Sequence, residues 1–252
     1  MIRINTTRVR AVVRKEFREY RRNKFIIYTM TTLPVIFLAI PLVTIFNLPA
    51  STPLVGVRSA VGSVLLLMLV IPDVLPATIA AYSVIGERDQ GTLEPLLTTP
   101  IRRDEFILGK ALAAIVPAVV MSYLVFAVAV TSLRLWAGAE VVHELWQPAW
   151  FVAEVLFVPL LATWSTWVGT AISARSSDVR VSQQLGTLAS LPVLALTSLM
   201  SYQVIKPTVL VAVIIACSLV TIDIVAWRVV SKMFNRERLI TGVKVRIEPK
   251  VL

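Results

Sequence analysis

Six long apolar segments follow one another along the chain, with shorter polar segments between them. Their predicted boundaries are 25–46, 59–85, 107–133, 149–173, 184–205 and 208–227. A helix needs about 20 mainly apolar residues to cross the hydrocarbon core of a bilayer. Because that core offers no water to backbone N–H and C=O groups, each segment is expected to be helical. The pattern therefore predicts an all-α integral membrane protein with six transmembrane helices.

The boundary between the last two segments is the least marked. Only Lys206 and Pro207 separate them clearly, and part of 197–208 could instead form a short re-entrant segment. Proline is tolerated in spanning helices, where neighbouring groups satisfy the freed carbonyl, so internal prolines predict kinks rather than breaks. The internal prolines are Pro34, Pro41, Pro72, Pro76, Pro117, Pro159 and Pro192.

The basic residues predict the orientation. With the N-terminus inside, 22 of the 25 lysines and arginines fall on the inner side, and only Arg58, Arg134 and Lys206 fall outside. Basic residues concentrate in cytoplasmic loops, so both termini are expected to be cytoplasmic. The predicted regions are a cytoplasmic segment 1–24, a membrane domain 25–227 and a basic cytoplasmic tail 228–252.

The composition agrees with a membrane protein: 57% of the residues are hydrophobic and 16% are charged. The net charge of +10 follows the ends of apolar segments, which indicates topology rather than nucleic-acid binding. Tryptophans are expected to form interfacial belts, with Trp136, Trp146 and Trp150 on the outer side and Trp167 and Trp227 on the inner side. The single cysteine, Cys217, allows no internal disulfide and is expected to be a small packing residue.

The N-terminal segment predicts a basic amphipathic helix. Its apolar residues recur at helical spacing and are Val9, Val12, Val13, Phe17 and Tyr20, with arginines around the remaining surface. Thr6 or Thr7 is the expected N-cap. Such a helix lies in the membrane interface. It is either an anchor that fixes topology or a lever joined to the first span.

The 86–110 loop contains two helix-start signals. Gly91 permits a turn, and Thr92 can cap a short helix that tolerates Pro95 in its first turn. That helix would present Leu93, Leu96 and Leu97 on one side, as a surface for docking on another protein. In the second signal, Thr99 is followed by Pro100, from which one helix is expected to run into the third span.

The spacing of this loop resembles the signature of type-2 ATP-binding-cassette (ABC) exporter permeases. The matching residues are Glu87, Gly91, Thr92, Leu93, Glu94, Leu96, Leu97, Thr99, Pro100 and Arg102, followed by Gly109 and Lys110. The resemblance extends over the chain, with an N-terminal amphipathic helix, six spans, and the signature between spans two and three.

The resemblance implies a defined assembly. Two six-span subunits, identical or similar, would form the pathway, and two cytoplasmic ATPase subunits would power it. The segment from Gly91 to Pro100 would be the coupling helix that docks on the ATPase, and residues 7–24, with Val9, Val13, Phe17 and Tyr20, the connecting helix. It also implies export and a prokaryotic plasma membrane.

The ATPase is expected to be a separate polypeptide. A P-loop reads Gly-x-x-x-x-Gly-Lys-Ser/Thr. The single Gly-Lys pair, Gly109-Lys110, has Asp104 in place of the first glycine and Ala111 in place of the hydroxyl residue. The chain is therefore predicted to be a transporter subunit and not an enzyme, with no cofactor or metal of its own; the partner would bind ATP and magnesium.

Three carboxylates fall within the predicted spans. Asp73 is expected near mid-membrane, where it could line a polar pathway, because ionisable residues in spans are costly and often functional. Glu154 is expected to be an interfacial residue, and Asp223 to reach toward Arg228 or another cation on the inner side. His143 has no neighbours suited to metal binding.

The predicted function is thus a permease subunit of an ATP-driven exporter. The apolar spans suit hydrophobic or amphipathic cargo such as drugs or lipids. Two alternatives remain open: a secondary transporter driven by an ion gradient, and a membrane scaffold that positions an ATPase without transporting anything. Secondary transporters often contain repeated halves, and this sequence has no clear internal repeat.

Overall fold

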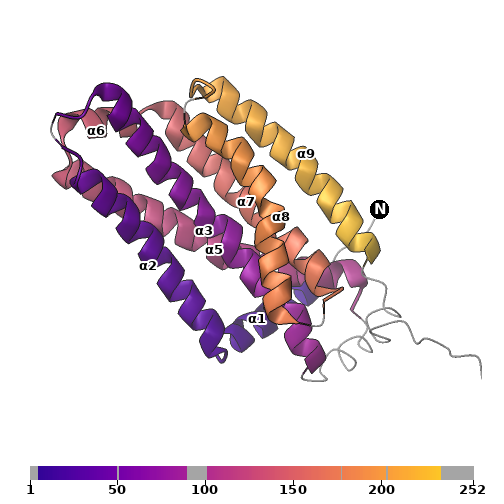
Figure 1. Cartoon of the computed structure of the whole chain (residues 1–252). Coiled ribbons are helices and arrows are strands. Elements are labelled where there is room, and N and C mark those ends of the chain that lie inside the picture. The colour runs from indigo at the N-terminus through magenta and orange to yellow at the C-terminus, as the bar shows by residue number, and fades with distance from the viewer. Residues whose placement is uncertain (1–4, 50, 90–100, 177, 203, 234–252) are drawn as a thin grey trace, which may run out of the picture.

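The computed structural model describes residues 5–49, 51–89, 101–176, 178–202 and 204–233, and within these ranges it is helical without strands (Figure 1). In chain order the helices are α1 (Thr6–Tyr20), α2 (Lys24–Phe46), α3 (Leu54–Asp89), α5 (Arg103–Trp136), α6 (Ala139–Leu145), α7 (Pro148–Ser173), α8 (Val179–Ser201) and α9 (Val209–Met233). The prediction of an all-α protein is confirmed.

Five of the described helices are long and apolar enough to cross a membrane. They are α2, residues Leu54–Tyr82 of α3, residues Asp104–Trp136 of α5, α7 and α9. These correspond to five of the six predicted segments, and prolines lie within α2, α3, α5 and α7 without ending them. Helix α8 stands where the fifth span is expected and has 23 residues, but it is not among the five. A count of six spans therefore remains a prediction.

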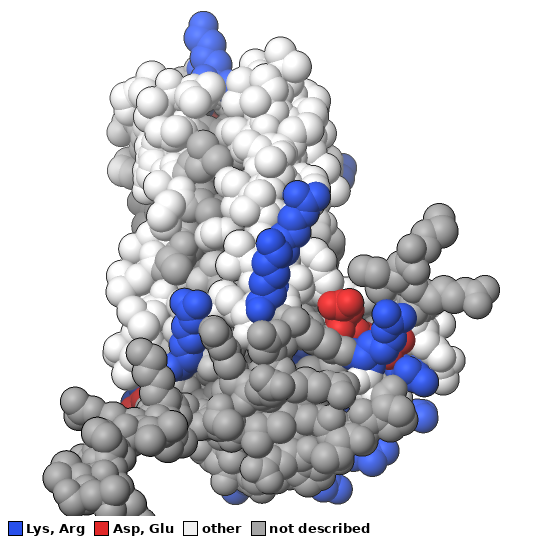
Figure 2. Space-filling view, turned by 90° about the vertical axis from the view of Figure 1, so that its right-hand side faces the viewer, with Lys and Arg blue, Asp and Glu red and all other residues white. Residues whose placement is uncertain are grey.

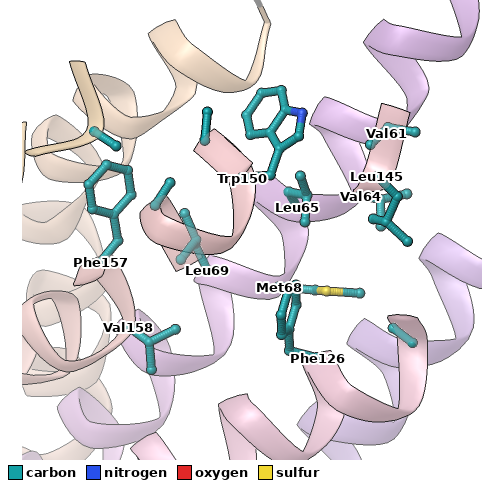
Figure 3. Close-up of a cluster of buried hydrophobic side chains, with 14 of the residues drawn as sticks. Val61, Val64, Leu65, Met68, Leu69, Phe126, Leu145, Trp150, Phe157 and Val158 are labelled. Carbon is teal, nitrogen blue, oxygen red and sulfur yellow. The ribbon is translucent and has the colours of Figure 1, made fainter. Parts of the chain in front are cut away.

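Helices α3 and α7 form the centre of the bundle. Figure 3 shows the main core, where Leu65 and Met68 of α3 meet Phe126 of α5 and Phe157 of α7. These side chains are buried at 8% exposure or less. Apolar contact between long helices thus sets the frame, with α2, α8 and α9 around it (Figure 1).

Small residues allow three helices to approach closely. A Cβ atom added to Gly169 of α7 would lie 3.0 Å from the carbonyl oxygen of Ala77 on α3. One added to Gly186 of α8 would lie 3.6 Å from the Ala77 Cβ atom. Small residues at such crossings let backbones pack tightly where lipid gives no hydrophobic driving force.

Two short helices mark the ends of the bundle (Figure 1). Helix α1 runs across one end, here named the α1 end, and α6 lies at the opposite end, the α6 end. At the α6 end, the Arg58 Nε atom lies 2.9 Å from the Glu144 Oε1 atom, which ties α6 to α3. The sequence did not predict α6, which has only seven residues.

Several local predictions are wrong. Helix α1 is capped by Asn5, whose side chain accepts a hydrogen bond from the Thr7 N–H, and not by a threonine. Trp150 and Trp167 are buried inside the bundle rather than lying in belts. Cys217 is exposed on α9 instead of packed.

Candidate coupling site

Helix α5 begins beside α1, and the Glu105 carboxylate joins the two. Glu105 is buried in the first turn of α5, where its Oε2 atom accepts the Arg102 N–H at 3.0 Å. Its Oε1 atom accepts the N–H of Asn5 at 2.9 Å, and the Arg8 guanidinium lies 3.5 Å from Oε2. Hydrogen bonds to a charged group are stronger than neutral ones, by roughly twofold. One carboxylate therefore fixes the start of α5 to the start of α1.

One turn further, α1 and α5 touch at a glycine. A Cβ atom added to Gly109 would lie 2.7 Å from the Cβ atom of Val12 and 3.3 Å from the carbonyl oxygen of Val9. Carbon atoms in favourable contact are about 3.5–4.0 Å apart, so any larger residue would separate the helices. The absence of a side chain at Gly109 is what permits this close approach.

A buried ion pair follows directly. The Lys110 Nζ atom of α5 lies 2.9 Å from the Glu16 Oε1 atom of α1, and the two side chains are 6% and 1% exposed. The ammonium also lies 5.1 Å from the centre of the Phe106 ring, within the range of a cation–π contact. Opposite charges held this closely away from water fix the register of the two helices.

Apolar residues surround these polar contacts. Val12 packs with Phe106, Ile107 and Trp167, while Tyr20 packs with a second group that includes Leu75. The exposed side of α1 carries Arg10, Arg14 and Arg18, and the exposed residues Arg21 and Arg22 follow directly after the helix. Helix α1 is thus attached to the base of the bundle along its length. We name its joint with α5, formed by Glu105, Gly109 and the Glu16–Lys110 pair, the α1–α5 clamp.

Comparison with protein-family models gives a match over residues 7–230, to the family described as ABC-2 type transporter. This chain belongs to that family. Comparison with curated proteins gave no match. The ABC-2 membrane domain is the permease component of ABC transporters, which typically work with an ATPase partner. The resemblance seen in the loop between spans two and three is therefore confirmed at the level of the family.

The structure covers only part of the predicted coupling motif of this ABC-2 protein. Glu87 lies in the last turn of α3, and its side chain is outside the described residues. The residues Gly91, Thr92, Leu93, Glu94, Leu96, Leu97, Thr99 and Pro100 also lie outside the described residues. Arg102 is the N-cap of α5, which begins at Arg103 and not directly after Thr99 as expected.

The predicted face of α1 is the one that packs. Val9 and Tyr20 are buried, and Val13 and Phe17 pack against the group around Tyr20. Sequence reasoning missed Glu16, which is completely buried on this same face. Its spacing could have revealed it, because a residue seven positions after Val9 and four before Tyr20 lies on the same face of a helix as these two apolar residues.

The carboxylates in the spans are all buried. The backbone carbonyl of Asp73 accepts a hydrogen bond from the Ser165 hydroxyl, which links α3 to α7. Glu154 is 2% exposed and lines a small pocket with Leu65, Trp150 and Thr197, so the expectation of an interfacial residue is wrong. Asp223 is 8% exposed, and within the described residues its carboxylate has no hydrogen-bond partner, including Arg228. A pathway role for Asp73 stays a prediction.

Proposed function

We propose that this ABC-2 protein is the permease subunit of an ATP-driven exporter and is driven by a separate cytoplasmic ATPase. Two permease copies, identical or similar, would form the pathway with two ATPase subunits. The proposed membrane is the plasma membrane of a prokaryote. Helix α8 would be the fifth of six spans in chain order, and the α1 end would face the cytoplasm. The observation that carries the proposal is the α1–α5 clamp, which begins at Glu105, five residues after the segment 91–100.

The clamp gives that segment a mechanical role. A displacement of 91–100 by the ATPase would reach Arg102 and the first turn of α5 directly. Because Glu105 and Lys110 tie that turn to α1, the two helices would move together instead of bending separately. Packed elements with buried contacts transmit such shifts as rigid units. ATP binding to the partner could then alter the conformation of the spans through differential docking of this loop.

Hydrophobic or amphipathic cargo, such as a drug or a lipid, is proposed from the apolar character of the bundle. Helix α2 exposes large apolar side chains along its length, including Phe25, Tyr28 and Val35. A permease with these surfaces offers little to a strongly charged solute. No observation on the described residues favours gradient-driven transport or a purely structural role over this proposal.

The test is the double substitution Leu96→Asp and Leu97→Asp. Two charges in the docking surface would prevent apolar contact with the ATPase, so export of a fluorescent amphipathic substrate from ATP-loaded vesicles should be lost. Membrane insertion should remain normal, since the segment lies outside the spans. The matched control is Val181→Asp, which replaces an exposed apolar residue before the predicted span 184–205 and leaves the segment 91–100 intact. Normal export by the Leu96/Leu97 double variant would contradict docking through this segment.

A further inference from the structure

An apolar groove runs between α7 and α9 near the α1 end. Its volume is about 400 Å³, and its walls include Trp164, Trp167 and Val168 from α7 and Val225 and Val229 from α9. Small-molecule sites typically measure about 300–1,000 Å³. The groove is open on one side and its lining is almost wholly apolar. It therefore suits a flexible hydrocarbon chain, which is also what surrounds a spanning helix.

Two cations lie at one edge of this groove. Arg228 follows Val225 by three residues, and Lys232 follows Val229 by three. Residues three apart on a helix are neighbours on its surface, so both basic residues lie next to residues that line the groove. Both are exposed, and neither forms an ion pair within the part of the chain that is described. Figure 2 shows the side of the molecule that is on the right in Figure 1. Most of the basic side chains seen there lie in its lower half, below a surface that carries few charged side chains.

The acidic group on the same helix points away from these cations. Asp223 is 8% exposed and lies on the buried side of α9, whereas the edge with Arg228 and Lys232 is exposed. The groove therefore combines an apolar lining with two basic residues next to it, near the α1 end. That combination matches an acyl chain joined to an anionic headgroup.

We infer that the α7–α9 groove binds one acyl chain of an anionic membrane phospholipid, whose phosphate is held by Arg228 and Lys232. The inference goes beyond the proposed export and does not depend on it, because binding is measured without an ATPase. Each Lys or Arg at a membrane surface favours anionic lipid by about fivefold, so two give a preference of up to about 30-fold over zwitterionic lipid.

Tryptophans in the groove provide a direct assay. The full chain is reconstituted in vesicles of phosphatidylcholine. A small fraction of the lipid is replaced by a probe lipid with brominated acyl chains, which is either phosphatidylglycerol or phosphatidylcholine. Bromine atoms close to a tryptophan quench its fluorescence. The quenching that arises in the groove is measured as the part of the fluorescence quenching that is lost in the Trp164→Phe variant. This part of the quenching should reach half its maximum at a several-fold lower mole fraction of brominated phosphatidylglycerol than of brominated phosphatidylcholine.

Two variants, each with a control, test the binding of the lipid headgroup and of the acyl chain separately. Arg228→Gln with Lys232→Gln should remove the preference between the two lipids, while Lys206→Gln, before the other end of α9, should keep it. Ala226→Phe should fill the groove and reduce quenching by both lipids, while Val220→Phe, on an exposed part of α9, should not.

The same experiment can overturn the inference. Equal quenching by both lipids in the wild-type chain, or an unchanged preference in the Arg228/Lys232 variant, would contradict a specific anionic lipid. A second copy of the chain is the competing occupant. Cys217 is exposed one helical turn before Thr221, which lines the groove, so a disulfide between two Cys217 residues under mild oxidation would assign the groove to a dimer contact instead.

Discussion

The Glu16–Lys110 pair gives the sharpest prediction about the α1–α5 clamp. The substitution Glu16→Gln leaves the Lys110 ammonium at 6% exposure and removes the carboxylate that lies 2.9 Å away. Breaking a buried pair by removing one partner costs about 3–5 kcal/mol, since the remaining charge is poorly solvated. Lys110→Met should have a similar effect. Replacing both residues, with Glu16→Met and Lys110→Met, should cost much less than the sum.

The free energy of docking of α1 is the quantity to measure. Hydrogen exchange reports local opening, and α1 amides of the purified chain should exchange faster by a factor of at least 100 in either single variant. The matched control is Glu19→Gln on the same helix. Glu19 is 47% exposed and pairs with Lys15 at 3.0 Å, and exposed pairs of this spacing contribute about 0.3–0.5 kcal/mol. Its exchange should change by about twofold.

Two results would refute this reasoning. If Glu16→Gln changed α1 exchange no more than Glu19→Gln does, the ion pair would not hold the helices together. If the effects of Glu16→Met alone and Lys110→Met alone simply added in the double variant, the residues would not interact, because contacting residues are non-additive.

Three further substitutions test two other contacts of the α1–α5 clamp and one contact at the opposite end of the bundle. Gly109→Ala places a carbon 2.7 Å from Val12 and should weaken α1 docking by about 1–3 kcal/mol, measured by the same exchange experiment. Glu105→Gln should weaken the first turn of α5 through loss of hydrogen bonds to a charged carboxylate, seen as faster exchange of that turn; unchanged exchange would show that these hydrogen bonds do not hold α5 to α1. Glu144→Gln should loosen α6 from Arg58, seen as faster exchange in α6, without changing α1 docking; a change at α1 would contradict the independence of the two ends.

The positions of the helices were predictable because the hydrocarbon core of a membrane satisfies no backbone hydrogen bonds. The segment predicted at 25–46 corresponds to Lys24–Phe46, and that at 149–173 to Pro148–Ser173. An apolar run of spanning length in hydrocarbon has few alternatives to a helix. The apolar face of α1 was also readable, since helical periodicity selects the positions that pack.

Tertiary pairing was not predictable in the same way. Glu16 and Lys110 are 94 residues apart, and nothing local indicates that they meet. The start of α5 depends on Glu105, which binds both Arg102 and Asn5, so a local Thr-Pro signal could not place it. Trp150 was misplaced because a tryptophan near the end of an apolar run has the same local pattern in a core as at an interface.

The most direct test of the central claim is to isolate the tagged chain from its native membrane in mild detergent and identify its partners by mass spectrometry. The proposed coupling predicts a P-loop ATPase at about one copy per permease, and its loss in the Leu96→Asp, Leu97→Asp variant. A second, similar permease in the same sample would indicate a heterodimer. If the wild-type chain is isolated without any ATPase in several mild detergents, coupling to a separate ATPase is contradicted.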